Sequence, residues 1–140
     1  MSSIRDKRGI LFIDGASYGN PGDAGIGVLV YDINHRCVEK VSQYIGKATN
    51  NVAEYTALTT ALIEALILGF REIEIKSDSE LLVRQLRGRY KVKSNNIKIL
   101  YLLAKHLIRG YKKVEIDYIR REQNKEADRL ANEAIKNRDK

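Results

Sequence analysis

The first third of the chain has the hydrophobic pattern of β-strands separated by short turns. Gly9–Asp14 is a largely apolar run that predicts a strand buried on both faces. Gly25–Tyr31 and Arg36–Ile45 predict two more strands, and the turn residues Asn20-Pro21-Gly22 and Asp32–His35 separate them. Because the connections are short, the pattern favours an antiparallel meander in which each strand pairs with the next.

The hydrophobic period changes after residue 50, where apolar residues recur every three or four positions. This spacing predicts an amphipathic helix, with Thr49 or Asn50 as its N-cap and Gly69 at its end. The remaining segments predict a strand over 72–78, helices over 79–86 and 97–109, a strand over 114–119, and a helix opening at Asn124 or Lys125. The order βββαβααβα predicts an α/β fold with a five-stranded mixed sheet and helices packed on it.

Length and composition limit the class of protein. With 140 residues, we expect one domain over 1–140, with a frayed polar N-terminus over 1–8. The apolar stretch 57–70 contains Glu64 and is too short to span a bilayer, so no membrane partner is expected. The single cysteine, Cys37, excludes an internal disulfide, is expected to be a packing residue, and fits a reducing compartment such as the cytoplasm. Nothing in the sequence demands more than a monomer.

The chain is basic, with a formal net charge of +7. This excess favours a polyanionic partner, most simply nucleic acid, although many basic proteins bind none. The segment 84–93 concentrates positive charge around one aromatic residue, Tyr90. It is therefore the part of the chain that we expect to hold a nucleic-acid strand.

Four acids occupy distinctive places in the predicted elements. Asp14 and Asp78 end strands that should both be central, and Glu54 and Asp128 are expected in the first turns of helices. Each acid has an ordinary explanation by itself, as a turn residue or as a complement to the helix dipole. Together, however, they can converge at the edge of the sheet where strands end and helices begin.

Clustered carboxylates repel one another unless a cation neutralises them. Oxygen ligands suit Mg²⁺ or Mn²⁺ rather than zinc, and the sequence offers no cluster of histidines and cysteines. An acidic metal site on a basic protein indicates phosphate chemistry, in which two divalent ions activate water and stabilise the leaving oxygen of a phosphodiester.

Four motifs, in order along the chain, resemble those of the type 1 ribonucleases H. They are Asp14-Gly15-Ala16-Ser17-Tyr18-Gly19-Asn20-Pro21-Gly22, Thr49-Asn50-Asn51-Val52-Ala53-Glu54, Ser77-Asp78-Ser79 and Asn124-Lys125-Glu126-Ala127-Asp128-Arg129-Leu130-Ala131. The resemblance covers nearly the whole chain and agrees with the predicted order of elements. It implies a ribonuclease H-like fold and an endonuclease that cuts the RNA strand of RNA–DNA hybrids with two divalent ions, leaving 5′-phosphate and 3′-hydroxyl ends.

The resemblance also implies roles for individual residues. Asp14, Glu54, Asp78 and Asp128 match the metal-binding catalytic acids, with Asp14 as the ligand shared by both ions. Thr49 matches a position that contacts a phosphate of the DNA strand. The residues expected to contact the substrate are Gly15, Asn20, Thr49, Asn50, Asn51, Ser79, Glu80, Arg89, Lys91, Ser94, Asn95 and Asn124. An asparagine amide both donates and accepts hydrogen bonds, so it can recognise a ribose 2′-hydroxyl, although capping explains Asn50 and Asn51 equally well.

The sequence departs from the family pattern at two places. Many members carry a histidine in the loop before the last acid, whereas 117–125 contains none. This is similar to archaeal-type short members with an arginine there, so we expect Arg121 to position substrate or aid product release, with Arg120 as the alternative. Arginine binds phosphate but does not exchange protons near neutral pH. Glu80 stands where a glutamine is common, which adds a negative charge near the substrate.

Two other functions are compatible with the same features. One is a nuclease of this fold that cuts double-stranded RNA, or both kinds of duplex. The other is a nucleic-acid-binding module that has no catalytic activity. The retention of all four acids favours the enzyme.

Overall fold

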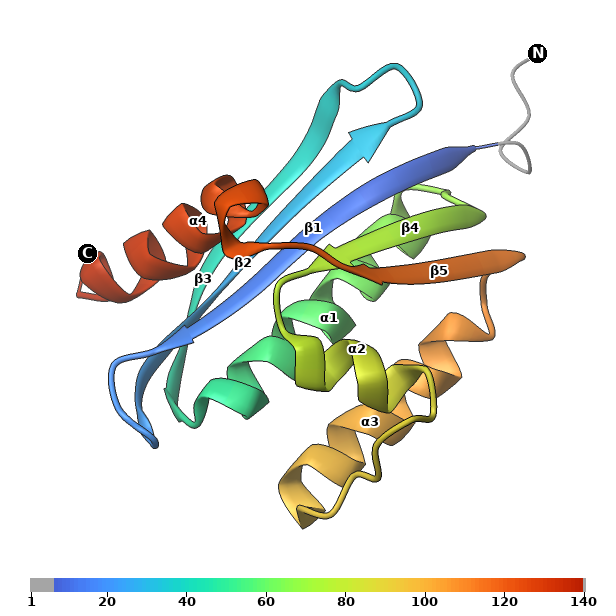
Figure 1. The fold of residues 1–140 in the computed structure, drawn as a ribbon. Helices are drawn as coiled ribbons and strands as arrows, with labels where there is room; N and C mark the ends of the chain where they lie inside the picture. Colours follow the sequence, from blue (N-terminus) through green and yellow to red (C-terminus); the bar gives the residue numbers. More distant parts are fainter. Residues whose placement is uncertain (1–6, 140) are drawn as a thin grey trace.

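The computed structural model describes residues 7–139, in which five strands form one mixed sheet in the order β3-β2-β1-β4-β5 (Figure 1). The strands are β1 (Arg8–Ser17), β2 (Gly22–Asp32), β3 (Cys37–Ala48), β4 (Glu72–Ser77) and β5 (Lys113–Tyr118). The helices are α1 (Asn50–Ile67), α2 (Glu80–Leu86), α3 (Asn95–Ile108) and α4 (Lys125–Lys136), with a 3₁₀ turn over Arg121–Gln123. The predicted fold class and element order are confirmed. The first three strands pair antiparallel, whereas β1, β4 and β5 pair parallel.

Helices cover the two faces of the sheet unequally. α1 packs on β1 and β2 and is itself contacted by α3, whereas α4 lies over β2 and β3 on the other face (Figure 1). Alternate residues of β1 therefore enter different cores. Leu11 and Ile13 pack with residues of α1, and Phe12 packs with Leu130 of α4. Because both faces of β1 are buried, its sequence is a continuous apolar run rather than an alternation of apolar and polar residues.

The start of the chain differs from its prediction. Residues 1–6 of the segment expected to fray lie outside the described residues. Arg8 already belongs to β1, and the carbonyl of Lys7 accepts a hydrogen bond from the N–H of Arg71 at 3.0 Å. The prediction of fraying is therefore wrong for Lys7 and Arg8, because sheet pairing and this bond hold them.

β1 is also longer than predicted, since it continues through Asp14 to Ser17. β2 pairs with it as far as Ser17 and Ala24, so Asp14 is not followed at once by a turn. On its other side, the parallel ladder with β4 ends at Ile13 and Ser77. Asp14 therefore lies where β1 loses one of its two neighbours.

Cys37 is exposed, which corrects its expected role as a packing residue. It begins β3, an edge strand of the sheet, and the first two residues of this strand are both exposed. Among residues 7–139, no helix combines the length and the apolar character that crossing a membrane requires.

Candidate active site

Three of the four predicted acids converge on one point. Asp14, Glu54 and Asp78 each present a carboxylate oxygen, and these oxygens lie within 4.8 Å of one another. They come from β1, from α1 and from the residue after β4. Asp128, from α4, lines the same cavity as these three acids. The predicted convergence of the four acids at one edge of the sheet is confirmed.

The strand order explains why Asp14 and Asp78 meet. β1 and β4 run parallel, and Ile13 and Ser77 are the last residues paired between them. The next residue on each strand is an acid, so both carboxylates lie at the carboxyl end of the parallel ladder. In the sheet order β3-β2-β1-β4-β5, successive strands are added on one side of β1 and then on the other, and open α/β sheets place ligand sites where the strand order reverses in this way.

Glu54 reaches the same point from the second turn of α1, which corrects its predicted place in the first turn. α1 begins at Asn50 after the N-cap Thr49, and it has no acid in its first turn. The helix dipole therefore does not explain Glu54. Its Oε1 instead accepts a hydrogen bond from the backbone N–H of Gly15 at 2.8 Å, and the side chain is buried.

Asp128 is placed by a close approach of α4 to β2. A Cβ on Gly27 would lie 2.1 Å from the carbonyl oxygen of Ala127, and one on Gly25 would lie 2.5 Å from that of Ala131. The two glycines thus allow the helix backbone to lie directly on the strand. Asp128 occupies the first turn of α4, as predicted.

Asn132 holds Asp128 and was not predicted from the sequence. Its Nδ2 donates to Oδ1 of Asp128 at 3.2 Å and to the carbonyl oxygen of Asp128 at 2.9 Å. Its position four residues after an acid on a predicted helix is the signal that could have identified it, because such residues share a helix face.

The acids perturb one another strongly. Burial, followed by the charges of Glu54 and Asp78, raises the pKa of Asp14 to about 10. Burial and then the charge of Asp78 raise the pKa of Glu54 to about 8. Burial is also the main reason that the pKa of Asp78 is raised. The fully ionised cluster is therefore unfavourable at neutral pH unless a cation is close.

The donor set fits a divalent cation. Every converging ligand atom is a carboxylate oxygen, and the acids line a cavity of about 190 Å³ that opens at the surface. Hard, oxygen-only donors suit Mg²⁺ or Mn²⁺. Asp14, Glu54 and Asp78 would hold such an ion, with Asp128 beside them.

Arg121, rather than Arg120, lines this cavity. Its positive charge lowers the pKa of both Glu54 and Asp78, acting against the larger effect of burial. Arg120 is instead the N-cap of the 3₁₀ turn, and its N–H donates to Oε1 of Gln123 at 3.1 Å. The structure therefore favours the first of the two arginines named from the sequence.

The predicted substrate residues fall into separate groups. Gly15 and Asn50 line the cavity of the acids, although the N–H of Gly15 is already bonded to Glu54. Asn20 accepts a hydrogen bond from the N–H of Asn50 at 3.1 Å, and Thr49 caps α1 by accepting from the N–H of Val52 at 3.2 Å. These two side chains therefore shape the backbone beside the cavity.

A second group lines a groove of about 560 Å³ between α1, α2 and the start of α3. The predicted residues in it are Asn51, Arg89, Lys91 and Ser94. Tyr90 lies there too, with the guanidinium of Arg84 5.2 Å from the centre of its ring. Ser94 precedes α3 without capping it by a side-chain hydrogen bond, and Asn95 is the exposed first residue of that helix.

Ser79 and Glu80 have local partners in the structure. Ser79 caps α2 by accepting from the N–H of Leu82 at 3.3 Å. The carboxylate of Glu80 pairs with Arg84 one turn later, at 2.6 Å. The extra negative charge noted in the sequence is therefore balanced within α2.

Asn124 requires a correction, because it is not placed to contact a substrate. Its side chain is buried, with a relative exposure of 1%, and its Nδ2 donates to the carbonyl oxygen of Ile13 at 2.9 Å. The sequence motif identified the residue, but the structure places it beneath the acids.

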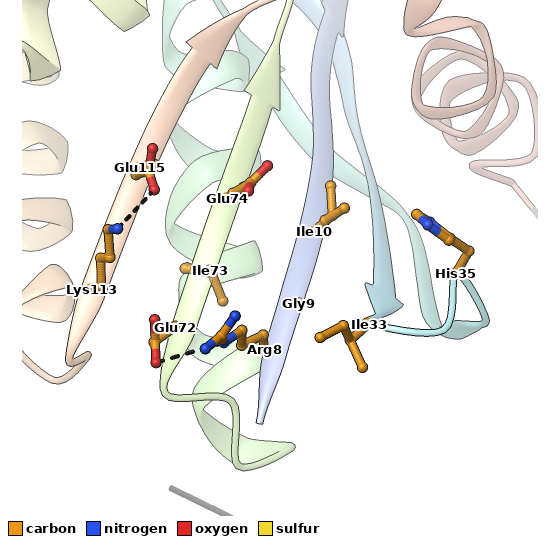
Figure 2. A pocket seen from close by; sticks show the side chains of 10 residues that line it. All are labelled: Arg8, Gly9, Ile10, Ile33, His35, Glu72, Ile73, Glu74, Lys113 and Glu115. Carbon is orange, nitrogen blue, oxygen red and sulfur yellow. Dashed lines mark ion pairs between the residues drawn. The ribbon is translucent and has the colours of Figure 1, made fainter. Parts of the chain in front are cut away.

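Another hollow, of about 420 Å³, lies at the opposite end of the sheet (Figure 2). Arg8 pairs with Glu72 at 3.8 Å and Lys113 with Glu115 at 3.3 Å, so its charges partly cancel. Arg8, which lines this hollow, lies six positions before Asp14 on β1, a distance of roughly 20 Å. The lining of the hollow includes none of the residues predicted from the sequence to act on a substrate.

Comparison with known proteins identifies the class. The model of the family described as reverse transcriptase-like matches residues 12–134. The bifunctional protein Rv2228c of Mycobacterium tuberculosis is 42% identical over 127 residues, which are 90% of this chain and 35% of that protein. The chain thus spans about a third of the length of the first curated relatives it matches.

Two solved structures show the same fold at high identity. RNase H1 from Halobacterium salinarum is 38% identical, with a TM-score of 0.90, covering 92% of this chain and 98% of that one. LC11-RNase H1 in complex with an RNA/DNA hybrid is 41% identical, with a TM-score of 0.87, covering 91% and 96%. The chain belongs to the type 1 ribonuclease H family, as its sequence motifs indicated.

Proposed function

We propose that the chain is an endoribonuclease that hydrolyses the RNA strand of RNA–DNA hybrids and leaves 5′-phosphate and 3′-hydroxyl ends. The observation that carries this proposal is the convergence of the Asp14, Glu54 and Asp78 carboxylates within 4.8 Å, beside Asp128. The similarity over 91% of the chain to a ribonuclease H1 bound to an RNA/DNA hybrid supports the choice of substrate.

The proposed cofactor is a pair of divalent ions, Mg²⁺ with Mn²⁺ as a substitute. When bound, such ions increase the acidity of a water and neutralise charge on the scissile phosphodiester. The raised pKa of Asp14 and of Glu54 supports this requirement, because a cation replaces the protons that otherwise relieve repulsion. Glu54, Asp78 and Asp128 all act on the carboxyl of Asp14, which is the proposed shared ligand.

Recognition of the hybrid is proposed to involve both the cavity and the groove. Asn50 lines the cavity of the acids and Asn51 lines the groove, so the two consecutive amides bridge the two sites. Amides at such positions can bond the 2′-hydroxyls that distinguish RNA from DNA. Arg89 and Lys91 line the same groove, where they neutralise phosphates of the DNA strand.

Arg121 is proposed to bind a phosphate of the substrate at the mouth of the cavity. It lines the same cavity as the acids, and the planar guanidinium of an arginine can bond two oxygens of a phosphate at once. We further propose that one chain acts as a monomer, because all four acids come from the same chain. The single exposed thiol of Cys37 fits a reducing compartment such as the cytoplasm.

The test is cleavage of end-labelled duplexes of one sequence: RNA–DNA hybrid, double-stranded RNA and DNA. Each is incubated with Mg²⁺, with Mn²⁺ and with EDTA. The expected result is metal-dependent cutting confined to the RNA strand of the hybrid. Comparable cutting of double-stranded RNA would contradict the proposed specificity, and cutting in EDTA would contradict the proposed cofactor.

Asp14→Asn is the matched control, because it retains the size of the side chain and removes one charge from the centre of the cluster. We expect it to abolish cleavage while it still binds the hybrid. Binding without cleavage by the unaltered protein, with either metal, would assign it to the class of non-catalytic binding modules.

A further inference from the structure

Asn124 connects two of the segments that carry acids. Its buried Nδ2 donates to the carbonyl oxygen of Ile13, the residue before Asp14, at 2.9 Å. Its own carbonyl oxygen accepts a hydrogen bond from the N–H of Asp128 at 3.1 Å. One residue thus joins β1 to the first turn of α4, across 111 positions of sequence.

The amide of Asn124 also affects the acid of the third segment. Burial raises the pKa of Asp78, and the amide of Asn124 acts against this effect. Asn124 is therefore hydrogen-bonded to the residue before Asp14 and to Asp128 itself. Glu54 is held separately, by the N–H of Gly15.

The orientation of the Asn124 amide does not serve the helix that it precedes. Asn124 occupies the N-cap position of α4, yet its side chain makes no capping hydrogen bond. Among the buried side-chain atoms of residues 7–139, its Oδ1 is the one without a hydrogen-bond partner. An asparagine at an N-cap ordinarily uses this oxygen to accept from the helix. Here the nitrogen donates to the backbone of β1 and the oxygen is left unbonded.

A contact with substrate does not explain this arrangement either, because the side chain is only 1% exposed. The bond to Ile13 instead fixes the distance between β1 and α4. Since donors behind metal ligands orient them, loss of such a contact typically lowers metal affinity or activity by about 10–100-fold.

We propose that Asn124 is a positioning residue that sets the spacing of Asp14 and Asp128 and thereby the affinity of the site for divalent cations. The inference rests on the proposed use of a divalent metal, but it does not require that the substrate be a hybrid.

Asn124→Ala tests the inference, and Ser42→Ala is its matched control. Oγ of Ser42 donates to the carbonyl oxygen of Leu130 at 2.6 Å, so it also ties the sheet to α4 by one hydrogen bond. Ser42 lies on β3, and it lines neither the cavity of the acids nor the basic groove. Both variants lose a bond of the same kind, but only one loses it beside the acids.

Binding of Mg²⁺ and Mn²⁺ is measured by calorimetry without nucleic acid, and thermal midpoints are measured in EDTA. We expect both variants to have lower thermal midpoints. We expect only Asn124→Ala to weaken metal binding, by about tenfold or more. With saturating metal, the KM for the hybrid should remain within about twofold of the original value, because the groove is unchanged.

Unchanged metal affinity in folded Asn124→Ala would overturn the inference, as would an equal loss of affinity in Ser42→Ala. If Asn124→Ala does not fold, Asn124→Ser takes its place, because serine retains a short hydrogen-bond donor. The metal affinity of this variant is then compared with that of Ser42→Ala. Metal binding by a protein that cleaves no hybrid would refute the proposed function, and the calorimetric comparison would still decide the role of Asn124.

Discussion

The backbone N–H of Gly15 donates to Oε1 of Glu54 at 2.8 Å, and this bond joins β1 to α1 directly beside Asp14. The same N–H lies 3.0 Å from Oδ1 of Asp14. Two carboxylates from different elements therefore share one backbone donor. The arrangement requires close contact between strand and helix, and only a residue without a Cβ permits it.

Gly15→Ala tests this packing. The added Cβ would lie 2.3 Å from the carbonyl carbon of Ala53 and 2.4 Å from the nitrogen of Glu54. Because both are backbone atoms, α1 must move away from β1, at a cost of about 1–3 kcal/mol in the free energy of unfolding. We expect cleavage to fall by about 100-fold or more, since misplacement by 1 Å can cost that much. Denaturant unfolding and cleavage rates measure the two effects.

Gly46→Ala is the control for Gly15→Ala. Its backbone has φ +85°, and its added Cβ would meet nothing within 4 Å. Backbone strain should lower the free energy of unfolding of the Gly46→Ala variant by about 1–2 kcal/mol, and the variant should retain cleavage. If the two variants lose activity equally, stability rather than the position of Glu54 explains the effect.

The pH dependence of stability should differ between the metal-free and the metal-bound protein. The pKa of Asp14 is raised to about 10 and that of Glu54 to about 8, so the folded state holds protons that the unfolded state releases near pH 4. Without metal, their contribution to the free energy of unfolding therefore falls as pH rises from about 4 to about 8–10. The slope is at most about 1.4 kcal/mol per pH unit for each proton.

Thermal unfolding in EDTA from pH 5 to pH 9 checks this prediction. The thermal midpoint of the Asp14→Asn variant should fall less steeply as pH rises. At pH 9 this variant should be more stable than the unaltered protein. Mg²⁺ should raise the thermal midpoint of the unaltered protein more at pH 9 than at pH 5, because protons compete with the ion at low pH. Parallel pH profiles for the two proteins would show that Asp14 is not the group responsible.

Arg121 and Arg120 should differ in their effect on catalysis. Arg121 lines the cavity of the acids, whereas Arg120 caps the 3₁₀ turn before α4. We expect Arg121→Ala to lower kcat/KM for the hybrid by about tenfold, the loss of one charge-assisted hydrogen bond to phosphate. The kcat/KM of the Arg120→Ala variant should remain within about twofold of that of the unaltered protein. Steady-state kinetics measure both, and a larger effect at Arg120 would exchange the two roles.

The basic groove should contribute affinity without base specificity. Arg89 and Lys91 line it together with Asn51. The double variant Arg89→Ala/Lys91→Ala should weaken binding of the hybrid, and its affinity should depend less steeply on salt because two phosphate contacts are lost. Binding titrations at several salt concentrations measure this slope. An equal loss of affinity for double-stranded RNA would contradict selective contact with the DNA strand.

Local signals were sufficient to predict most of the fold. The change from a two-residue to a three- or four-residue period gave the order of elements, and Thr49 gave the start of α1. The predicted end of β1 was wrong because the strand ends where its pairing with β2 ends, and this pairing continues to Ser17. The predicted packing role of Cys37 was wrong because an edge strand and a central strand have similar local sequences. Only the order of strands in the sheet decides which strand is covered.

The candidate site was predicted from four acids and their motifs, and all four line one cavity, where three of them lie within 4.8 Å of one another. With Thr49 as the N-cap, sequence spacing places Glu54 in the second turn of α1. The bond from Gly15 to Glu54 could not be predicted in this way, because it depends on the contact between helix and strand. Asn124 was identified by its motif, but its burial follows from the docking of α4. The roles predicted for the exposed groove residues await the experiments above.

The bond between Asn124 and Ile13 has a consequence for the order of folding. The β1–β2–β3 meander joins neighbouring segments, whereas this bond closes a loop of 111 residues, and contacts between distant segments form more slowly. We expect α4 to dock late, so that an intermediate with the meander and α1 already formed still lacks Asp128. A divalent cation would then bind the finished chain more tightly than the intermediate, and it would slow unfolding by holding the last helix in place.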